Sequence, residues 1–311
     1  MEHSEEFEIL VSPETGLPLR YINSRLETET GTESFPVHNG IACLASVQNL
    51  SEIKRYEMGI FNSIPIQGIP YFRTCLLRDI MKVVKSVIRS LRGDLGKFVV
   101  AEMGGGEGYW ARFIKEDLRD AIVFVCDLSM DALARAPDHL KKVCADISRP
   151  IFKKKSIHLA SFWVSLHHLE KADMRNALFE ISKVLDDDGV LLIFEPNYAF
   201  LPRKIMYRTR LGKDVYFDKH EQAIDFSKIN KIAESFNLVE VVTHFMNPPY
   251  NYDFIRRLRR GGIYLPVVEA LHRIDKCLLS PIVGDMFSAK QSRLKKYFSL
   301  YGLSIYRKRK V

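Results

Sequence analysis

Residues 99–110 read Val-Val-Ala-Glu-Met-Gly-Gly-Gly-Glu-Gly-Tyr-Trp, an apolar run that meets a cluster of glycines. The pattern predicts a strand, a glycine-rich turn and a helix that follows at once. Glycines at such a turn let the backbone approach a ligand that a Cβ would exclude, and the N-terminus of the helix offers free N–H groups. The dinucleotide fingerprint G-x-G-x-x-G does not fit, because counting from Gly104 its third glycine falls on Tyr109. The spacing that fits is E-x-G-x-G-x-G, which runs from Glu102 to Gly108.

An acidic residue follows the next expected strand. Residues 121–126 read as a buried strand that ends at Asp127, 21 residues beyond Gly106. This is close to the spacing of about 20 residues between a nucleotide-binding glycine loop and the acid that holds the ribose. A carboxylate suits that task because it accepts hydrogen bonds from both hydroxyls of the diol. Ser129 then caps a helix expected over 129–136.

Polar residues also follow the remaining strands. Further strands are expected over residues 142–145, 157–164 and 190–194, which lead into Asp146, Ser165 and Glu195. A helix over 171–185 and a turn over 186–189 separate the last two of them. Strands that alternate with helices in this way predict an α/β fold with a doubly wound, mostly parallel sheet. In such a sheet ligands bind beyond the carboxyl ends of the strands, so these polar side chains are expected around one ligand.

Together, residues 95–200 resemble a class I S-adenosylmethionine (SAM)-dependent methyltransferase, most of all the small-molecule, lipid and glycan enzymes. Those enzymes often read L-x-H-H or similar after strand four and E-P-N after strand five; here residues 165–168 read Ser-Leu-His-His and residues 195–197 read Glu-Pro-Asn. The resemblance implies a seven-stranded Rossmann-like methyltransferase sheet, SAM as cofactor and S-adenosylhomocysteine as product. It implies that Asp146 meets the adenine amino group and that its apolar neighbour covers the ring. The cofactor-binding residues that it implies are Glu102, Gly104, Gly106, Gly108, Asp127, Leu128, Asp146, Ile147 and Ser165.

The resemblance implies transfer of a methyl group, for which the protein must align the acceptor and remove its proton. His168 and His220 are the candidate bases, because a histidine is neutral enough near pH 7 to accept a proton. A structural or surface role is the alternative for each. The favoured function is O-methylation of a small, lipid or glycan acceptor. An RNA (rRNA or tRNA) methyltransferase and a non-catalytic SAM-fold scaffold are the alternatives, and the intact glycine loop argues against the scaffold.

The amino-terminal residues 7–19 and 34–41 resemble the small zinc ribbon of a methyltransferase activator protein and of some rRNA guanine methyltransferases. The positions where the ribbon carries cysteines hold Ser12, Thr15, Thr28 and Gly31, which do not form a zinc ligand set. No metal is therefore expected. Without zinc the segment must be held by packing, so we expect it to dock on the catalytic domain. An unrelated β-rich extension is the alternative.

The carboxyl-terminal third contains a tetrapeptide, a basic insertion and a last strand near 297–306. Residues 247–250 read Asn-Pro-Pro-Tyr, which amino-group methyltransferases carry after their fourth strand. Here the tetrapeptide follows the sixth strand, 238–246, so a proline-rich turn is the better interpretation. Residues 250–290 interleave apolar side chains with four arginines near 256–260. This predicts a helical lid or cap, with docking on a membrane surface as the alternative.

Composition sets outer bounds. The chain has 311 residues, 47% hydrophobic and 27% charged, with a net charge of +8 that suits an anionic partner or plain solubility. Its acidic start is unlike a secretory signal peptide, and its five cysteines include no C-x-x-C pair. A cytoplasmic location is expected, with peripheral membrane contact through 250–290 as an option and nucleic acid as a less favoured partner. The expected segments are a ribbon-like amino-terminal segment (1–50), a helical linker or substrate-cleft region (51–97) and a SAM-binding core (98–249). The insertion (250–290) and a final core strand with a basic tail (291–311) follow.

Overall fold

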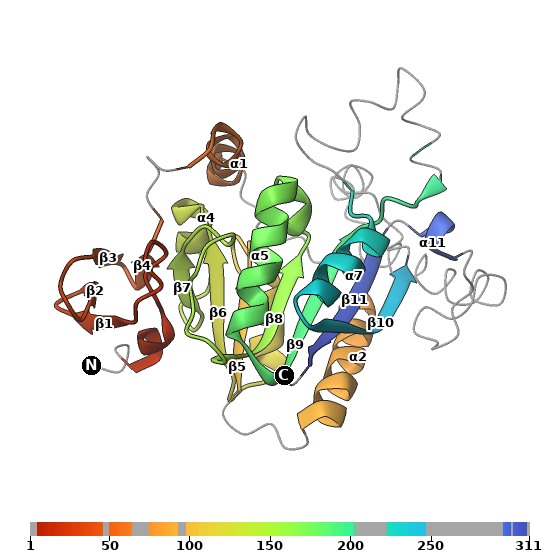
Figure 1. The fold of residues 1–311 in the computed structure, drawn as a ribbon, viewed down its shortest axis with the longest axis horizontal. Helices are drawn as coiled ribbons and strands as arrows, with labels where there is room; N and C mark the ends of the chain where they lie inside the picture. Colours follow the sequence, from red (N-terminus) through yellow and green to blue (C-terminus); the bar gives the residue numbers. More distant parts are fainter. Residues whose placement is uncertain are drawn as a thin grey trace, which may run out of the picture.

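The computed structural model describes residues 5–45, 50–63, 75–92, 98–201, 204, 223–246, 295–299 and 301–309. Their strands form one sheet in the order β1-β2-β3-β4-β7-β6-β5-β8-β9-β11-β10 (Figure 1). One apolar core lies between the sheet and helices α5 (Lys171–Val184) and α7 (Phe226–Ser235). A second core lies on the opposite face, against α2 (Cys75–Arg92) and α3 (Tyr109–Asp117). The sheet is therefore covered by helices on both sides.

Seven strands make the central sheet that the resemblance predicted. They are β5 (Val99–Met103), β6 (Ile122–Asp127), β7 (Lys141–Cys144), β8 (Ile157–Trp163), β9 (Leu185–Pro196), β10 (Leu238–Met246) and β11 (Tyr301–Lys308). Neighbouring strands from β7 to β9 pair in parallel, while β11 runs antiparallel to both β9 and β10. Every residue of β5 is buried, as expected for a strand with helices on both faces. The predicted doubly wound, mostly parallel sheet of seven strands is thus confirmed.

Helix α4 (Met130–Arg135) begins as the sequence predicted. Its cap, Ser129, accepts a hydrogen bond from the backbone N–H of Ala132 at 3.0 Å. The remaining short elements are the 3-10 helices η1 (Glu5–Ile9) and η4 (Leu166–His168) and the helices α1 (Glu52–Ser63) and α11 (Lys295–Phe298).

The turn expected over 186–189 lies inside a strand instead. Ile157 of β8 pairs with Leu185, and Leu159 pairs with Val190, so residues 186–189 bulge out of a longer β9. Within the bulge the backbone N–H of Asp188 bonds to the side chain of Asp186 at 3.1 Å, as in a turn. The strand was expected to begin at Val190, but it begins at Leu185, because this buried residue already pairs with Ile157 of β8.

The amino-terminal segment docks on the core, as expected, and it does so by extending the sheet. It contributes β1 (Leu19–Ile22), β2 (Arg25–Thr28), β3 (Ser34–His38) and β4 (Ile41–Cys43), and β4 pairs in parallel with β7. Backbone bonds from Val11 to Ile151 at 2.9 Å and from Lys153 to Ile9 at 2.7 Å hold its other side. Strands β1 to β4 and the seven central strands therefore share one continuous sheet.

Hydrogen bonds join the turns where a zinc ribbon would hold its metal. The carboxylate of Glu33 accepts from the hydroxyls of Ser12 at 2.7 Å and Thr15 at 2.5 Å. The backbone N–H of Glu33 donates to the hydroxyl of Thr28 at 3.2 Å, and the N–H of Gly31 donates to the carbonyl of Thr28 at 2.8 Å. Within the described ranges no three His, Cys, Asp or Glu side chains are placed to hold a metal ion.

Three predicted features lie outside the described residues: His220, the tetrapeptide 247–250 and the insertion 250–290. Of the helices that the structure describes, none combines the length and apolar character needed to cross a bilayer.

Candidate functional site

The predicted polar residues lie at one edge of the sheet. Because β5 to β8 are parallel, their carboxyl ends meet at the same edge, where ligands bind in this class of fold. The loops at this edge carry the glycine cluster after β5, Asp127 at the end of β6, Asp146 after β7 and Ser165 after β8. The topology alone therefore brings the predicted set together.

Gly104 contacts two of the other predicted residues. Its φ is +71°, and a Cβ at this position would lie 2.7 Å from the Cβ of Ser165 and 3.5 Å from the Cδ1 of Ile147. The hydroxyl of Ser165 also donates to the carbonyl of Met103 at 2.7 Å. Three residues from three loops thus pack so closely that only glycine fits at position 104.

Asp127 ties two loops of the edge together. One carboxylate oxygen accepts from the N–H of Gly106, and the other accepts from the N–H of Ser129, both at 2.8 Å. Desolvation raises the pKa of Asp127 above its ordinary value, although these N–H donors act in the opposite direction. Among the described residues, the nearest atom to a Cβ placed on Gly106 is this carboxylate at 4.0 Å. Space therefore remains above the glycine turn, beside the acid expected to hold a ribose.

Glu102 and Gly108 lie beneath the glycine loop, against protein. Glu102 is buried, and its carboxylate accepts a hydrogen bond from the N–H of Ala111 at 2.8 Å. This bond caps helix α3, because the N-cap residue of that helix, Gly108, has no side chain of its own to do so. Burial raises the pKa of Glu102 to about 8. A Cβ on Gly108 would lie 2.8 Å from Leu140, so this glycine allows α3 to pack closely. The structure gives both residues a role in shaping the loop.

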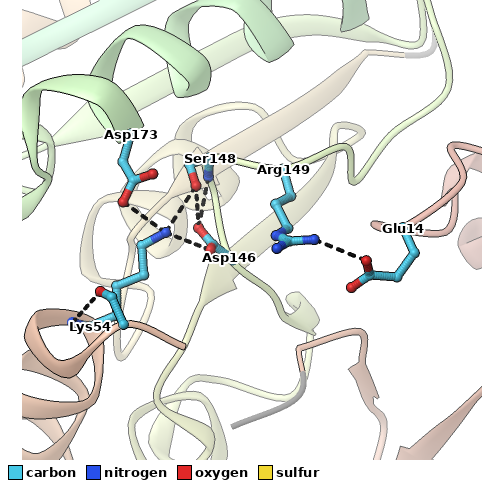
Figure 2. Close-up of polar contacts among 7 residues, drawn as sticks. Glu14, Lys54, Asp146, Ser148, Arg149 and Asp173 are labelled. Carbon is cyan, nitrogen blue, oxygen red and sulfur yellow. Dashed lines mark hydrogen bonds and ion pairs between the residues drawn. The ribbon is translucent and has the colours of Figure 1, made fainter. Parts of the chain in front are cut away.

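Asp146 is held by a network of donors (Figure 2). One oxygen accepts from the N–H and hydroxyl of Ser148 at 3.0 and 2.7 Å, and the other pairs with the ammonium of Lys54 at 2.6 Å. The same ammonium lies 2.9 Å from Asp173, at the start of α5. Burial opposes ionisation of Asp146, but the bonds from Lys54 and Ser148 outweigh it and lower its pKa. The acid predicted to meet adenine is therefore an ionised acceptor.

The two adjacent histidines after β8, His167 and His168, each face a different carboxylate. Nδ1 of His167 lies 2.7 Å from Glu195, a fully buried residue whose other oxygen accepts from the N–H groups of Ser165 and Leu166. Nδ1 of His168 lies 3.1 Å from Glu57 of α1. The imidazole rings are 4.0 Å apart. The predicted base is thus brought to the site, next to a partner that the sequence did not suggest.

Sequence reasoning missed Lys54 and Glu57, which reach the site from α1. Their distance along the chain from Asp146 and His168 carries no spacing signal, and charged residues on a helix ordinarily point to solvent. The motif at 195–197 did hold a signal for Glu195, although its role was not assigned. Asn197 of that motif donates to the carbonyls of Lys296 and Ser299 at 2.6 and 2.8 Å, which fixes the entry into β11.

Comparison with known families agrees with this geometry. Residues 100–189, from within β5 to the bulge in β9, match the family model described as "Methyltransferase domain". Residues 100–189 therefore match a methyltransferase domain, as the resemblance predicted. No curated protein matches the sequence.

Several solved structures are similar to this chain at low identity. A phosphoethanolamine N-methyltransferase 2 from Haemonchus contortus, in complex with S-adenosyl-L-methionine, is 14% identical, with a TM-score of 0.46. The match covers 74% of this chain but only 53% of that one, so the chain spans about half of its length. A SAM-dependent methyltransferase from Archaeoglobus fulgidus is 14% identical over 77% of this chain and 97% of its own, with a TM-score of 0.47. The [4+2]-cyclase SpnF is 15% identical over 73% and 80%, with a TM-score of 0.48. All three TM-scores are below 0.5, and the methyl acceptor stays open.

Proposed function

We propose that this chain binds SAM at the carboxyl edge of β5 to β8 and transfers its methyl group to an oxygen of a small, lipid or glycan acceptor. The observation that carries the proposal is the pairing of the glycine turn with Asp127. The carboxylate lies within 2.8 Å of the N–H of Gly106, and the described part of the chain leaves space above that glycine. This arrangement suits a ribose, because the carboxylate can accept both hydroxyls beside a backbone without side chains.

The other residues fit the rest of the same cofactor. Asp146 presents an ionised acceptor to an adenine amino group, and Ile147 supplies an apolar surface for the ring. Leu128 follows Asp127 at the same edge, and Ser165 closes it at the end of β8. SAM supplies an activated sulfonium methyl group, so the protein's task is to orient the acceptor and take its proton.

His168 is the base that we propose, with His220 as a second candidate outside the described residues. With SAM bound, His168 would take the hydroxyl proton of the acceptor at an imidazole nitrogen while the methyl group moved from the sulfonium sulfur to the acceptor oxygen, which would leave S-adenosylhomocysteine as the neutral product. An acceptor hydroxyl needs such a base near neutral pH, which supports O-methylation. The interleaved apolar residues and arginines of 250–290 support an apolar or amphipathic acceptor.

Two measurements test the proposal. Calorimetry should detect stoichiometric binding of SAM and S-adenosylhomocysteine to the purified chain. An untargeted comparison of methylated lipids, glycans and RNA in cells with and without the gene should show loss of a lipid, glycan or small-molecule methyl ether. Failure to bind either compound would favour the scaffold alternative, and loss of methylation from RNA alone would favour the RNA methyltransferase.

A further inference from the structure

Helix α1 lies at the carboxyl edge of the sheet, near α4 and the start of α5 (Figure 1). It contacts three separate loops of the candidate site through polar side chains. Lys54 pairs with Asp146 after β7, and Glu57 faces His168 after β8. Near its end, Asn62 accepts a hydrogen bond from the hydroxyl of Ser129 at 2.6 Å. A helix from outside the matched methyltransferase region thus reaches every loop that the site uses except the glycine turn.

Lys54 anchors this helix. Its ammonium is largely buried between Asp146 at 2.6 Å and Asp173 at 2.9 Å, and it also donates to Ser148 at 3.1 Å (Figure 2). Ion pairs that are partly buried and joined in a network hold geometry better than exposed single pairs. On the other side of the same loop, Arg149 pairs with Glu14 at 3.1 Å. The loop that carries Asp146 is therefore held by amino-terminal residues from two directions.

Glu57 is a buried acid without a hydrogen-bond donor among the described residues. Only 8% of the residue is exposed, and neither of its oxygens accepts a hydrogen bond there. Burying a carboxylate in this way is costly unless a positive charge lies close by. The group that faces it is Nδ1 of His168, at the ion-pair distance of 3.1 Å. The positive charge that His168 gains when it takes a proton would stabilise the buried carboxylate of Glu57.

We propose that Glu57 is a positioning residue for His168, and that α1, anchored by Lys54, completes the base of the site. The inference rests on the proposed function. The Glu57 carboxylate lies 3.1 Å from Nδ1 of His168, so it favours the positively charged form of that ring. When His168 takes the hydroxyl proton of the methyl acceptor, Glu57 balances the imidazolium charge. The base is therefore complete only while α1 is docked on the edge of the sheet.

Other charged groups near His168 act on its protonation as well. Asp127 at the end of β6 interacts with it electrostatically, and the ring of His167, with its own partner Glu195, lies beside it. These groups stay in place when Glu57 alone is changed. A comparison of Glu57 variants with the unchanged protein therefore isolates the contribution of α1.

NMR titration of the histidine rings tests the proposal without the methyl acceptor. The resonance of His168 is assigned by its loss in a His168→Gln variant. In Glu57→Gln the proton affinity of His168 should fall roughly tenfold, because the charged neighbour is gone. Glu52→Gln is the matched control, since it makes the same chemical change at an exposed position of the same helix. It should leave the His168 titration unchanged, and the His167 titration should change little in either variant.

Lys54→Gln provides a second variant that leaves the histidine and its acid intact. Loss of the anchor should release α1 and lower the proton affinity of His168 in the same direction. Equal His168 titrations in the unchanged protein, Glu57→Gln and Lys54→Gln would overturn the positioning role. Calorimetry with S-adenosylhomocysteine on the same samples separates the two proposals. Absence of binding to the unchanged protein contradicts the proposed function, whereas binding with unaltered titrations contradicts only the role of Glu57.

Discussion

Replacing Asp127 by alanine tests the cofactor site most directly. In the structure the carboxylate accepts from the N–H groups of Gly106 and Ser129 at 2.8 Å each, and it is the proposed acceptor for the ribose hydroxyls. Loss of hydrogen bonds between the ribose and a charged group should weaken binding of S-adenosylhomocysteine by about 1–3 kcal/mol. This corresponds to an increase of roughly 5- to 150-fold in Kd, since about 1.4 kcal/mol is a factor of ten.

The same substitution removes the acceptor of two backbone N–H groups, so part of the effect could come from the fold. Leaving such groups unpaired costs about 1–3 kcal/mol of stability, which thermal unfolding without ligand will measure. An Asp127→Asn variant keeps one acceptor oxygen for the backbone while it removes the charge. It should recover much of the stability but little of the affinity.

Isothermal titration calorimetry with S-adenosylhomocysteine is the assay, at a temperature where every variant is folded. Asp120→Ala is the matched control, because this exposed aspartate precedes β6 and lies at the opposite end of that strand from Asp127. Its Kd should equal that of the unchanged protein. If folded Asp127→Ala binds S-adenosylhomocysteine as tightly as this control does, then Asp127 does not hold the cofactor.

Three further substitutions test how the fold supports the site. Gly104→Ala should destabilise the chain more than Gly16→Ala, since both glycines have φ of +71° but only the first would bring a Cβ within 2.7 Å of Ser165; equal shifts in Tm would refute close packing. Because the folded-state pKa of Glu102, about 8, exceeds the ordinary 4.5, this acid costs stability as pH rises from about 4.5 to 8. Urea unfolding should therefore show Glu102→Gln gaining on the unchanged protein across that range, and a constant difference would contradict the pKa. Metal analysis should find no stoichiometric zinc, while Glu33→Gln lowers Tm; one tightly held zinc per chain would overturn the interpretation of the ribbon.

The core of the fold was predictable because its signals are local. Strands β5, β6 and β8 are short, largely apolar runs, and Gly104, Asp127 and Ser165 lie at or just after their ends. Parallel pairing then determines that Asp127, Asp146 and Ser165 lie at one edge, whatever the details of the loops. The spacing of Asp127 from Gly106 gave a correct contact, because helix α3 and strand β6 between them return the chain to the same edge of the sheet.

The direction in which a side chain points was less predictable than the edge of the sheet at which the residue lies. Asp127 accepts hydrogen bonds from the loop N–H groups of Gly106 and Ser129, whereas the carboxylate of Glu102 accepts from the N–H of Ala111 in the first turn of α3. Both residues are acids at the carboxyl ends of neighbouring strands, and the pattern does not distinguish them. The difference arises because α3 lacks a capping side chain at Gly108, so its unpaired N–H groups need an acceptor from elsewhere.

The histidine pair shows why the choice of a base needs tertiary structure. In the sequence His167 and His168 are equivalent neighbours. In the structure Glu195 holds His167 with one oxygen while its other oxygen binds two backbone N–H groups, so that pair is part of the framework. The side chain of His168 is 16% exposed, against 5% for His167, and its acid comes from a separate helix anchored by ion pairs. A base must meet solvent or substrate and change its charge, and His168 is the one of the two whose surroundings allow both.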